Sequence, residues 1–350
     1  MSQFQYNLPA GRINKLKGEI LAHAVPVEVL GITGQQRELP KNNGKTVVYR
    51  RYLPFGGSAT NYNTANRWNL DPATQILAEG VTPTADTLVP QDITTTLNQY
   101  GCLYQVSDQV VDTYEDDVPA EMKKQCGERV GLIRELVRYG AIKASTNVNY
   151  PGAIVSRATV NARITLPLLR KVSRNLQANH AKRITGILAP SPNISTKPIE
   201  AGFLVFAHSD TENDFRDMAG FVPVAQYGSR KQMHEQEIGS VENFRIITSP
   251  ELAPYPNAGV TGASGLTPPL SSTGGTFVDV YPVIVCGEDA WGQVALRGDN
   301  ALDPTWIPPG QKTKSDPLGQ RGFVGAKFYF NTVSLNDGWL AVIEVGVSAL

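Results

Sequence analysis

The sequence predicts an α+β chain organised around one unusually long helix. Apolar residues recur at gaps of four and three between residues 116 and 147, and this stretch holds no proline after Pro119. Two strand-like stretches, 46–53 and 93–106, enclose a long polar segment. The second half of the chain mixes apolar strand-like runs with short helical ones. These observations favour a flat molecule with a helical spine, a projecting hairpin and a mixed α/β region.

The long helix carries clear signals at its start. Asp116 and Asp117 can cap the first free backbone N–H groups, and Pro119 fits the first turn, where its missing N–H costs nothing. At about 1.5 Å per residue the helix would extend roughly 45 Å, which is comparable to the diameter of a small domain. We therefore expect it to cross the whole molecule.

One face of this helix is apolar and is expected to pack under strands of the same subunit. Leu136 and Ala141 widen this face, whose main members are Met122, Cys126, Val130, Ile133 and Val137. Basic residues are expected on the other side, free to meet another molecule. They are Lys123, Lys124, Arg129, Arg134 and Arg138.

The composition is that of an ordinary globular protein. Of the 350 residues, 41% are hydrophobic, and 32 basic side chains balance 32 acidic ones. A net charge of zero argues against attraction of the whole molecule to nucleic acid or to an anionic membrane, so any such contact must be local. The chain has no apolar run of about 18 residues or more, and its start does not resemble a signal peptide. We expect it to stay in the cytoplasm where it was made.

The cysteines give no sign of a special role. There are three, Cys102, Cys126 and Cys286, and they lie far apart in the sequence. An odd number at this spacing fits neither a disulfide framework nor a cluster of zinc ligands. We interpret them as reduced and structural.

Residues 1–45 form a candidate N-terminal arm. Short apolar pieces alternate there with glycine and proline, no period is sustained, and basic residues outnumber acidic ones. An arm with so few packing residues usually becomes ordered against another chain.

Residues 46–107 form a candidate extended hairpin loop. The pair Asn43-Gly44 is a strong turn signal just before the first strand, and the segment between the strands is rich in Gly, Asn, Thr and Pro. Loops of this length are uncommon inside a self-contained domain and often contact a partner. The candidate subunit contacts on this loop are Arg50, Arg51, Arg67 and Glu79.

A block of one charge sign follows the long helix. No Asp or Glu occurs between positions 136 and 199, although the whole chain is neutral. The block is either a solvated face or a surface that meets phosphate or an acidic segment of another copy. Its candidate contacts are Arg170, Lys171 and Arg174. The acidic candidates on the other copy are Asp210, Glu212 and Asp214.

The sequence contains no complete catalytic or metal-binding pattern. The four histidines lack the spacing of metal ligands. His208-Ser209-Asp210 contains the side chains of a hydrolase triad, but neighbours in sequence cannot adopt the triad geometry. The segment 210–221 imitates a calcium loop but has Phe215 and Phe221 where glycine and glutamate are needed. We therefore predict no catalytic, cofactor or metal site, and the sequence favours a structural or binding role.

The order of the parts resembles the tailed-phage major capsid proteins with the HK97-like fold, and more narrowly the phage N4-type major capsid family. In the first half the likeness rests on Glu79-Gly80, Pro83, Ile93, Tyr100-Gly101 and Asp108. In the second half it rests on Ile238-Gly239, Phe244-Arg245, Gly287, Ala290, Asp316-Pro317-Leu318-Gly319-Gln320, Gly325, Lys327 and Leu335-Asn336. One departure is Ala326, where an aromatic residue is expected before Lys327.

This resemblance implies a division of the chain into named parts. These are an arm (1–45), an extended hairpin or E-loop (46–107), a peripheral domain with the spine helix (108–164), an axial domain (165–310) and C-terminal strands that return to the core (311–350). It also implies a non-enzymatic shell subunit that forms hexamers and pentamers of an icosahedral head around double-stranded DNA. A portal and scaffold or decoration proteins would be its further partners, and no cofactor is implied.

Two other functions remain as alternatives from the sequence. One is an encapsulin-like nanocompartment shell, which would enclose cargo enzymes and no DNA. The other, from a different class, is a hydrolase that uses Ser209 or Ser264.

Overall fold

The computed structural model describes residues 28–53, 71–83, 85, 87–184, 201–228, 232–296, 303–312 and 314–349. Its strands are β1 (Gln35–Leu39), β2 (Thr46–Tyr52), β3 (Pro90–Thr96), β4 (Asn98–Ser107), β5 (Val148–Asn149), β6 (Phe203–Ala207), β7 (Phe221–Pro223), β8 (Glu237–Val241), β9 (Phe244–Thr248), β10 (Tyr281–Cys286), β11 (Trp291–Leu296), β12 (Asp303–Ile307), β13 (Arg321–Ser334) and β14 (Leu340–Val345). Its α-helices are α2 (Asp108–Thr113), α3 (Val118–Ile142), α4 (Leu166–Ala178) and α5 (Glu212–Arg216), and a 3-10 turn, η1, spans Leu30–Ile32.

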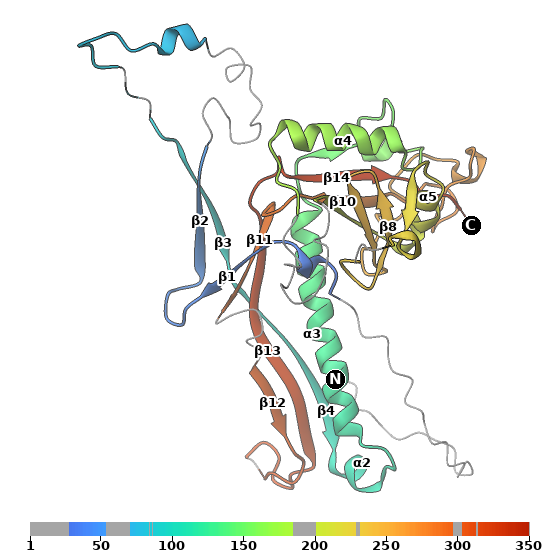
Figure 1. The fold of residues 1–350 in the computed structure, drawn as a ribbon. Coiled ribbons are helices and arrows are strands. Elements are labelled where there is room, and N and C mark those ends of the chain that lie inside the picture. The colour runs from blue at the N-terminus through green and yellow to red at the C-terminus, as the bar shows by residue number, and fades with distance from the viewer. Residues whose placement is uncertain are drawn as a thin grey trace.

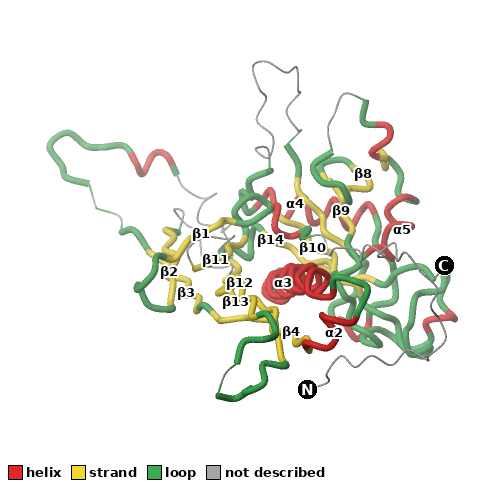
Figure 2. Tube along the Cα trace, turned by 90° about the horizontal axis from the view of Figure 1, so that it is seen from below, coloured by secondary structure: helices red, strands yellow, loops and turns green. Residues whose placement is uncertain are grey.

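The long helix α3 is the spine of an elongated molecule (Figure 1). It lies along a five-stranded sheet of order β1-β11-β13-β12, in which β4 pairs with the other edge of β13. Seen nearly end on, α3 lies between this sheet and the α/β domain that carries α4 and α5 (Figure 2). The helix therefore contacts both halves of the molecule.

The start of α3 agrees with the sequence prediction, and its end comes earlier than predicted. The Asp117 side chain accepts a hydrogen bond from the backbone N–H of Ala120, as an N-cap residue should. The helix stops at Ile142, short of the predicted Asn147. The chain then forms β5, which pairs in parallel with β14. Ser145, Thr146 and Asn147 favour a helix only weakly, so pairing with the sheet is the more stable arrangement here.

The apolar stripe of α3 faces the five-stranded sheet. Met122, Cys126 and Val130 are buried there with residues of β4 and β13, and Ile133 and Val137 are partly buried against the same cluster. Leu136, which was expected to widen the stripe, is 46% exposed.

The expectation that Arg138 lies on the free charged face of the helix is wrong. Its side chain is 1% exposed, and its Nε donates to Gln293 Oε1 of β11 at 2.9 Å. Its guanidinium also stacks over the ring of Phe330 of β13, with 5.3 Å between the guanidinium carbon and the ring centroid. A charge buried this deeply is tolerated only because it is paired. The prediction missed this because Gln293 and Phe330 lie on strands that are far from the helix in the sequence.

Arg138 and Glu135 form a buried joint with the arm. Arg138 pairs with Glu28 and, at 3.4 Å, with Glu135, which is itself almost fully buried. One Glu135 oxygen also accepts the backbone N–H groups of Val29 and Leu30, at 3.2 and 2.9 Å. Burial raises the pKa of Glu135, while these N–H groups and Arg138 act against the shift. The joint thus fixes residues 28–30 of the arm to the spine helix, just ahead of β1.

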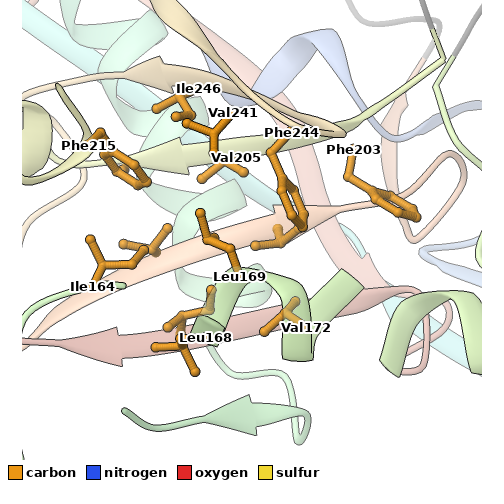
Figure 3. Close-up of a cluster of buried hydrophobic side chains, with 14 of the residues drawn as sticks. Ile164, Leu168, Leu169, Val172, Phe203, Val205, Phe215, Val241, Phe244 and Ile246 are labelled. Carbon is orange, nitrogen blue, oxygen red and sulfur yellow. The ribbon is translucent and has the colours of Figure 1, made fainter. Parts of the chain in front are cut away.

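The seven-stranded sheet, of order β5-β14-β10-β6-β9-β8-β7, forms the core of the α/β domain. Its central strand β6 is buried on both faces, as its continuous apolar sequence predicts. One face packs against α4 and α5 through Leu169, Val172, Phe203, Val205 and Phe215 (Figure 3). The other face packs against the C-terminal end of α3 and against η1.

The hairpin strands β2 and β3 pair antiparallel from Thr46↔Thr96 to Tyr52↔Pro90 and project from the body (Figure 1). The strand-like stretch 93–106 is split at Leu97, so β4 belongs to the five-stranded sheet and not to the projecting hairpin. In the same way β11 and β12 lie in the five-stranded sheet, although 165–310 was expected to form one axial domain. The reason is the length of β13, which offers one edge to β4 and the other to both β11 and β12.

We expect Glu135→Ala to lower the free energy of unfolding by about 3–5 kcal/mol, because it leaves Arg138 and two backbone N–H groups of the arm with fewer partners in a buried place. Urea unfolding of the unassembled chain measures this loss. The matched control is Glu121→Ala on the same helix, whose partly exposed ion pair with Lys124 is worth about 1 kcal/mol or less. Equal losses for the two variants would contradict the role given to the joint.

Candidate assembly surfaces

The projecting hairpin exposes large apolar side chains. Five of them, each at least half exposed, are Ile76, Leu77, Val81, Leu88 and Val89. They lie between β2 and β3, beyond the paired strands, and none of them belongs to a core cluster among the described residues. Exposed apolar groups gathered on one extension indicate a surface that another molecule covers.

A cleft of about 730 Å³ lies at the root of the hairpin. Tyr49, Arg51 and Ile93 line it from the hairpin strands, and His180 and Trp339 line it from the body. Burial raises the pKa of Tyr49 to about 12, so the phenol stays protonated and donates to the backbone oxygen of Gln293 at 3.4 Å. The cleft therefore combines apolar walls with fixed polar groups.

Two of the predicted contact residues on the hairpin are engaged within the chain. Arg50 holds Asp92 on the opposite strand with two hydrogen bonds, of 2.7 and 2.9 Å, in an exposed position. Arg51 donates to Gln91 at 2.8 Å and to the backbone oxygen of Leu335 at 2.9 Å. Arg51 thus ties the hairpin to the body, and the pair at Arg50 stiffens the ladder.

Two further hairpin candidates are Glu79 and Arg67. Glu79 is exposed, close to the apolar residues described above. Arg67 lies outside the described residues.

The outer face of α4 carries the predicted basic contacts. Arg170, Lys171 and Arg174 are all exposed, while the opposite face of the helix is buried in the core. Arg170 is already paired with Glu242, its Nε lying 2.8 Å from Oε1. Within the part of the chain that the structure describes, Lys171 and Arg174 have no acidic partner. These two cations are the charges that α4 offers to another molecule.

Much of the basic block is neutralised inside the subunit. Arg157 binds the buried carboxylate of Glu344, with 3.0 Å between Nε and Oε2, and its guanidinium lies 3.7 Å from the centre of the Tyr255 ring. Arg163 lies 3.4 Å from the buried Asp214. A count of charges along the sequence overstates the free positive charge, because it cannot show these long-range pairs.

The acidic candidates are also partly used within the chain. Asp214 is buried and accepts hydrogen bonds from the backbone N–H and the hydroxyl of Ser348, at 3.1 and 2.6 Å. Glu212 pairs with Arg216 one turn along α5, and Asp210 accepts from the Tyr281 hydroxyl at 2.8 Å. Asp210 and Glu212 remain at the surface, whereas Asp214 is taken up by the C-terminal end of the chain.

The described residues do not assemble a hydrolase site at His208. The Nδ1 atom of His208 accepts the backbone N–H of Asp210 at 3.1 Å and lies 3.2 Å from the Asp210 carboxylate, but in the described part of the chain no hydrogen bond joins His208 to Ser209, as a triad requires. Among the described residues no cluster of three His, Cys, Asp or Glu could hold a metal ion. None of the helices described is long and apolar enough to cross a membrane.

The exposed apolar residues of the hairpin were missed in the sequence. Ile76 and Leu77 stand in a polar stretch without helical or strand periodicity, so no pattern assigned them to a core. Their isolation in a polar loop could have identified them as contact residues, because large apolar residues in a long loop either pack locally or meet a partner.

A known protein is similar to this chain along almost its whole length. No protein-family model matches the sequence. The chain is 23% identical over 394 aligned residues to the major capsid protein of Pseudomonas phage KPP21, and the alignment covers 97% of this chain and 96% of that protein. The similarity therefore runs through the whole chain and is not confined to one domain.

Solved phage capsids share the fold. The capsid of Ralstonia phage GP4 matches with a TM-score of 0.64 at 10% identity, over 90% of this chain and 87% of that one. The capsid of cyanophage Pam1 matches with a TM-score of 0.60 at 14% identity, over the full length of both chains. The head of Helicobacter pylori bacteriophage KHP40 matches with a TM-score of 0.59 at 13% identity, over 93% of this chain and 92% of that one.

The predicted HK97-like fold is thus confirmed, and neither the nanocompartment nor the hydrolase alternative finds support. The chain thus has the fold of phage capsid proteins, and its sequence is similar along almost its whole length to a known phage major capsid protein, a structural component of the virion.

Proposed function

We propose that copies of this chain join through the hairpin into hexamers and pentamers, which close into an icosahedral head around double-stranded DNA. The observation that carries the proposal is the set of exposed apolar residues on the hairpin, which projects away from the body of its own subunit (Figure 1). Burying one such side chain stabilises a contact by about 1.5–3 kcal/mol, so several of them per subunit suffice for a strong contact.

In this arrangement the hairpin lies over a neighbouring subunit. The ladder of β2 and β3, the pair Arg50–Asp92 and the Arg51 contact with the body hold it in an extended form before any neighbour arrives. A segment that is ordered in advance loses less conformational entropy on binding. The same proposal includes the division of the chain into arm, E-loop, peripheral domain, axial domain and C-terminal strands. It also includes the assignment to the phage N4-type major capsid family.

The DNA is contacted without sequence preference in this proposal. A subunit of zero net charge has no strong field of its own, so contact with phosphate must come from local cations such as Lys171 and Arg174. A portal and scaffold or decoration proteins complete the expected partners.

Replacing Ile76, Leu77 and Leu88 together by serine should abolish particle formation while the body of the subunit stays folded, because these side chains pack on nothing within the described chain. Sedimentation of the purified protein gives the particle yield, and the melting temperature reports the fold. The control is Gln75→Ser, a change of one exposed polar residue for another in the same loop. Normal particle yield from the triple variant would rule out the hairpin contact, as would normal yield after deletion of residues 56–90.

Reversing charge at Lys171 and Arg174 with glutamate should reduce particle yield or DNA retention at least about tenfold, because both are free cations on one helix face. Electron microscopy and the nucleic-acid content of the particles separate the two effects. The control exchanges the two residues as Lys171→Arg and Arg174→Lys, which keeps the charge. Filled particles at wild-type yield from the glutamate variant would show that this face is merely solvated.

A further inference from the structure

Two cysteines that lie far apart in the sequence meet inside the subunit. Cys102 is on β4 and Cys126 is on α3, and their Sγ atoms are 2.6 Å apart. Two sulfur atoms that are not bonded stay farther apart than this, while a disulfide bond needs about 2.05 Å. A movement of well under 1 Å would therefore close the bond.

The surroundings favour a pair that is held in place. Both thiols are buried, with exposed fractions of 7% and 4%, in the cluster that packs α3 against the five-stranded sheet. The residue opposite Cys102 on β13 is Ala326, a small buried residue of the same cluster. A small side chain here leaves room beside the thiols that a ring would occupy.

The third cysteine provides an internal comparison. Cys286 is fully buried on β10 in the other domain, packed with Leu204, Phe206 and Trp291. Neither Cys102 nor Cys126 belongs to that cluster. The chain thus has one matched pair and one isolated thiol.

We propose that Cys102 and Cys126 form an intrachain disulfide that links the spine helix to β4 once the protein leaves the reducing interior of the cell. A thiolate of the pair attacks a small disulfide oxidant and forms a mixed disulfide, and the second thiol then displaces the oxidant's remaining half. One S–S bond forms in the protein, and the two protons and two electrons reduce the oxidant to two thiols.

The disulfide forms only outside the host cell. Cytosolic thiols are kept reduced, so the pair stays open during synthesis and assembly. Burial raises the pKa of Cys126 to about 12, with the neighbouring Cys102 adding to the shift, which leaves little thiolate at neutral pH and makes the closure slow. The pairing rests on contacts within one subunit, while its value to a shell rests on the proposed function.

The test uses the full chain, unassembled and as particles, incubated with oxidised glutathione over hours and compared with samples kept in dithiothreitol. Mass spectrometry should show the loss of two hydrogen atoms per chain. Trypsin should release the segment 125–129 joined to the segment 68–123, because no Lys or Arg divides either one. The apparent melting temperature of the oxidised chain should rise by about 5 °C.

Matched variants separate the pair from the third cysteine. Cys102→Ala and Cys126→Ala should each lose the joined peptide and the rise in melting temperature, whereas Cys286→Ala should keep both. Three free thiols in the folded wild-type chain after oxidation, or a bond that involves Cys286, would overturn the proposal. The bond should form in unassembled chain even if no particles form, so a failure of the shell assignment and a failure of the disulfide give different results.

Discussion

The structure depends on the buried charge of Arg138. A guanidinium removed from water is costly unless it is fully paired, and its partners here come from four separate segments: Glu28 of the arm, Glu135 of the same helix, Gln293 of β11 and Phe330 of β13. The charge can therefore be accommodated only when the arm, the helix and the sheet are in their native places. Such a group adds little net stability, but it penalises arrangements in which any one of these segments is displaced.

This joint lies where the spine helix passes from one sheet to the other. Toward its N-terminus α3 packs on β4 and β13, and toward its C-terminus Tyr139 and Ile142 pack under the seven-stranded sheet. The two domains are therefore held by one rigid element and not by a flexible linker. The base of the hairpin is attached to the same frame through Arg51 and the backbone of Leu335. A load applied to the hairpin by a neighbouring subunit would pass directly into the sheet and the helix.

The sequence predicted the elements whose signals are local. The start of α3 at Asp117, the pairing of the hairpin strands and the buried strand β6 follow from capping, turn and hydrophobic patterns over a few residues. Features that depend on distant partners were missed. Arg138 looked like a surface residue because its pairing with Glu28 and Gln293 has no trace in the helix pattern, and the parallel pairing of β1 with β11 joins residues more than 250 positions apart. The assembly candidates show the same limit, because Asp214 was selected by charge although Ser348 and Arg163 bind it inside the subunit.

The neutrality of the chain has a consequence for a shell built from many copies. Any net charge on one subunit would be multiplied over the shell and would oppose its closure by self-repulsion. Here part of the basic block is offset within the subunit, by Glu344 at Arg157 and by Glu242 at Arg170, so copies in the proposed shell would meet with a smaller field between them. Exposed ion pairs contribute little to a contact, typically less than about 1 kcal/mol each. In the proposed shell the energy that joins the copies would therefore come mainly from apolar surface, and among the described residues the hairpin is where a run of such surface lies uncovered.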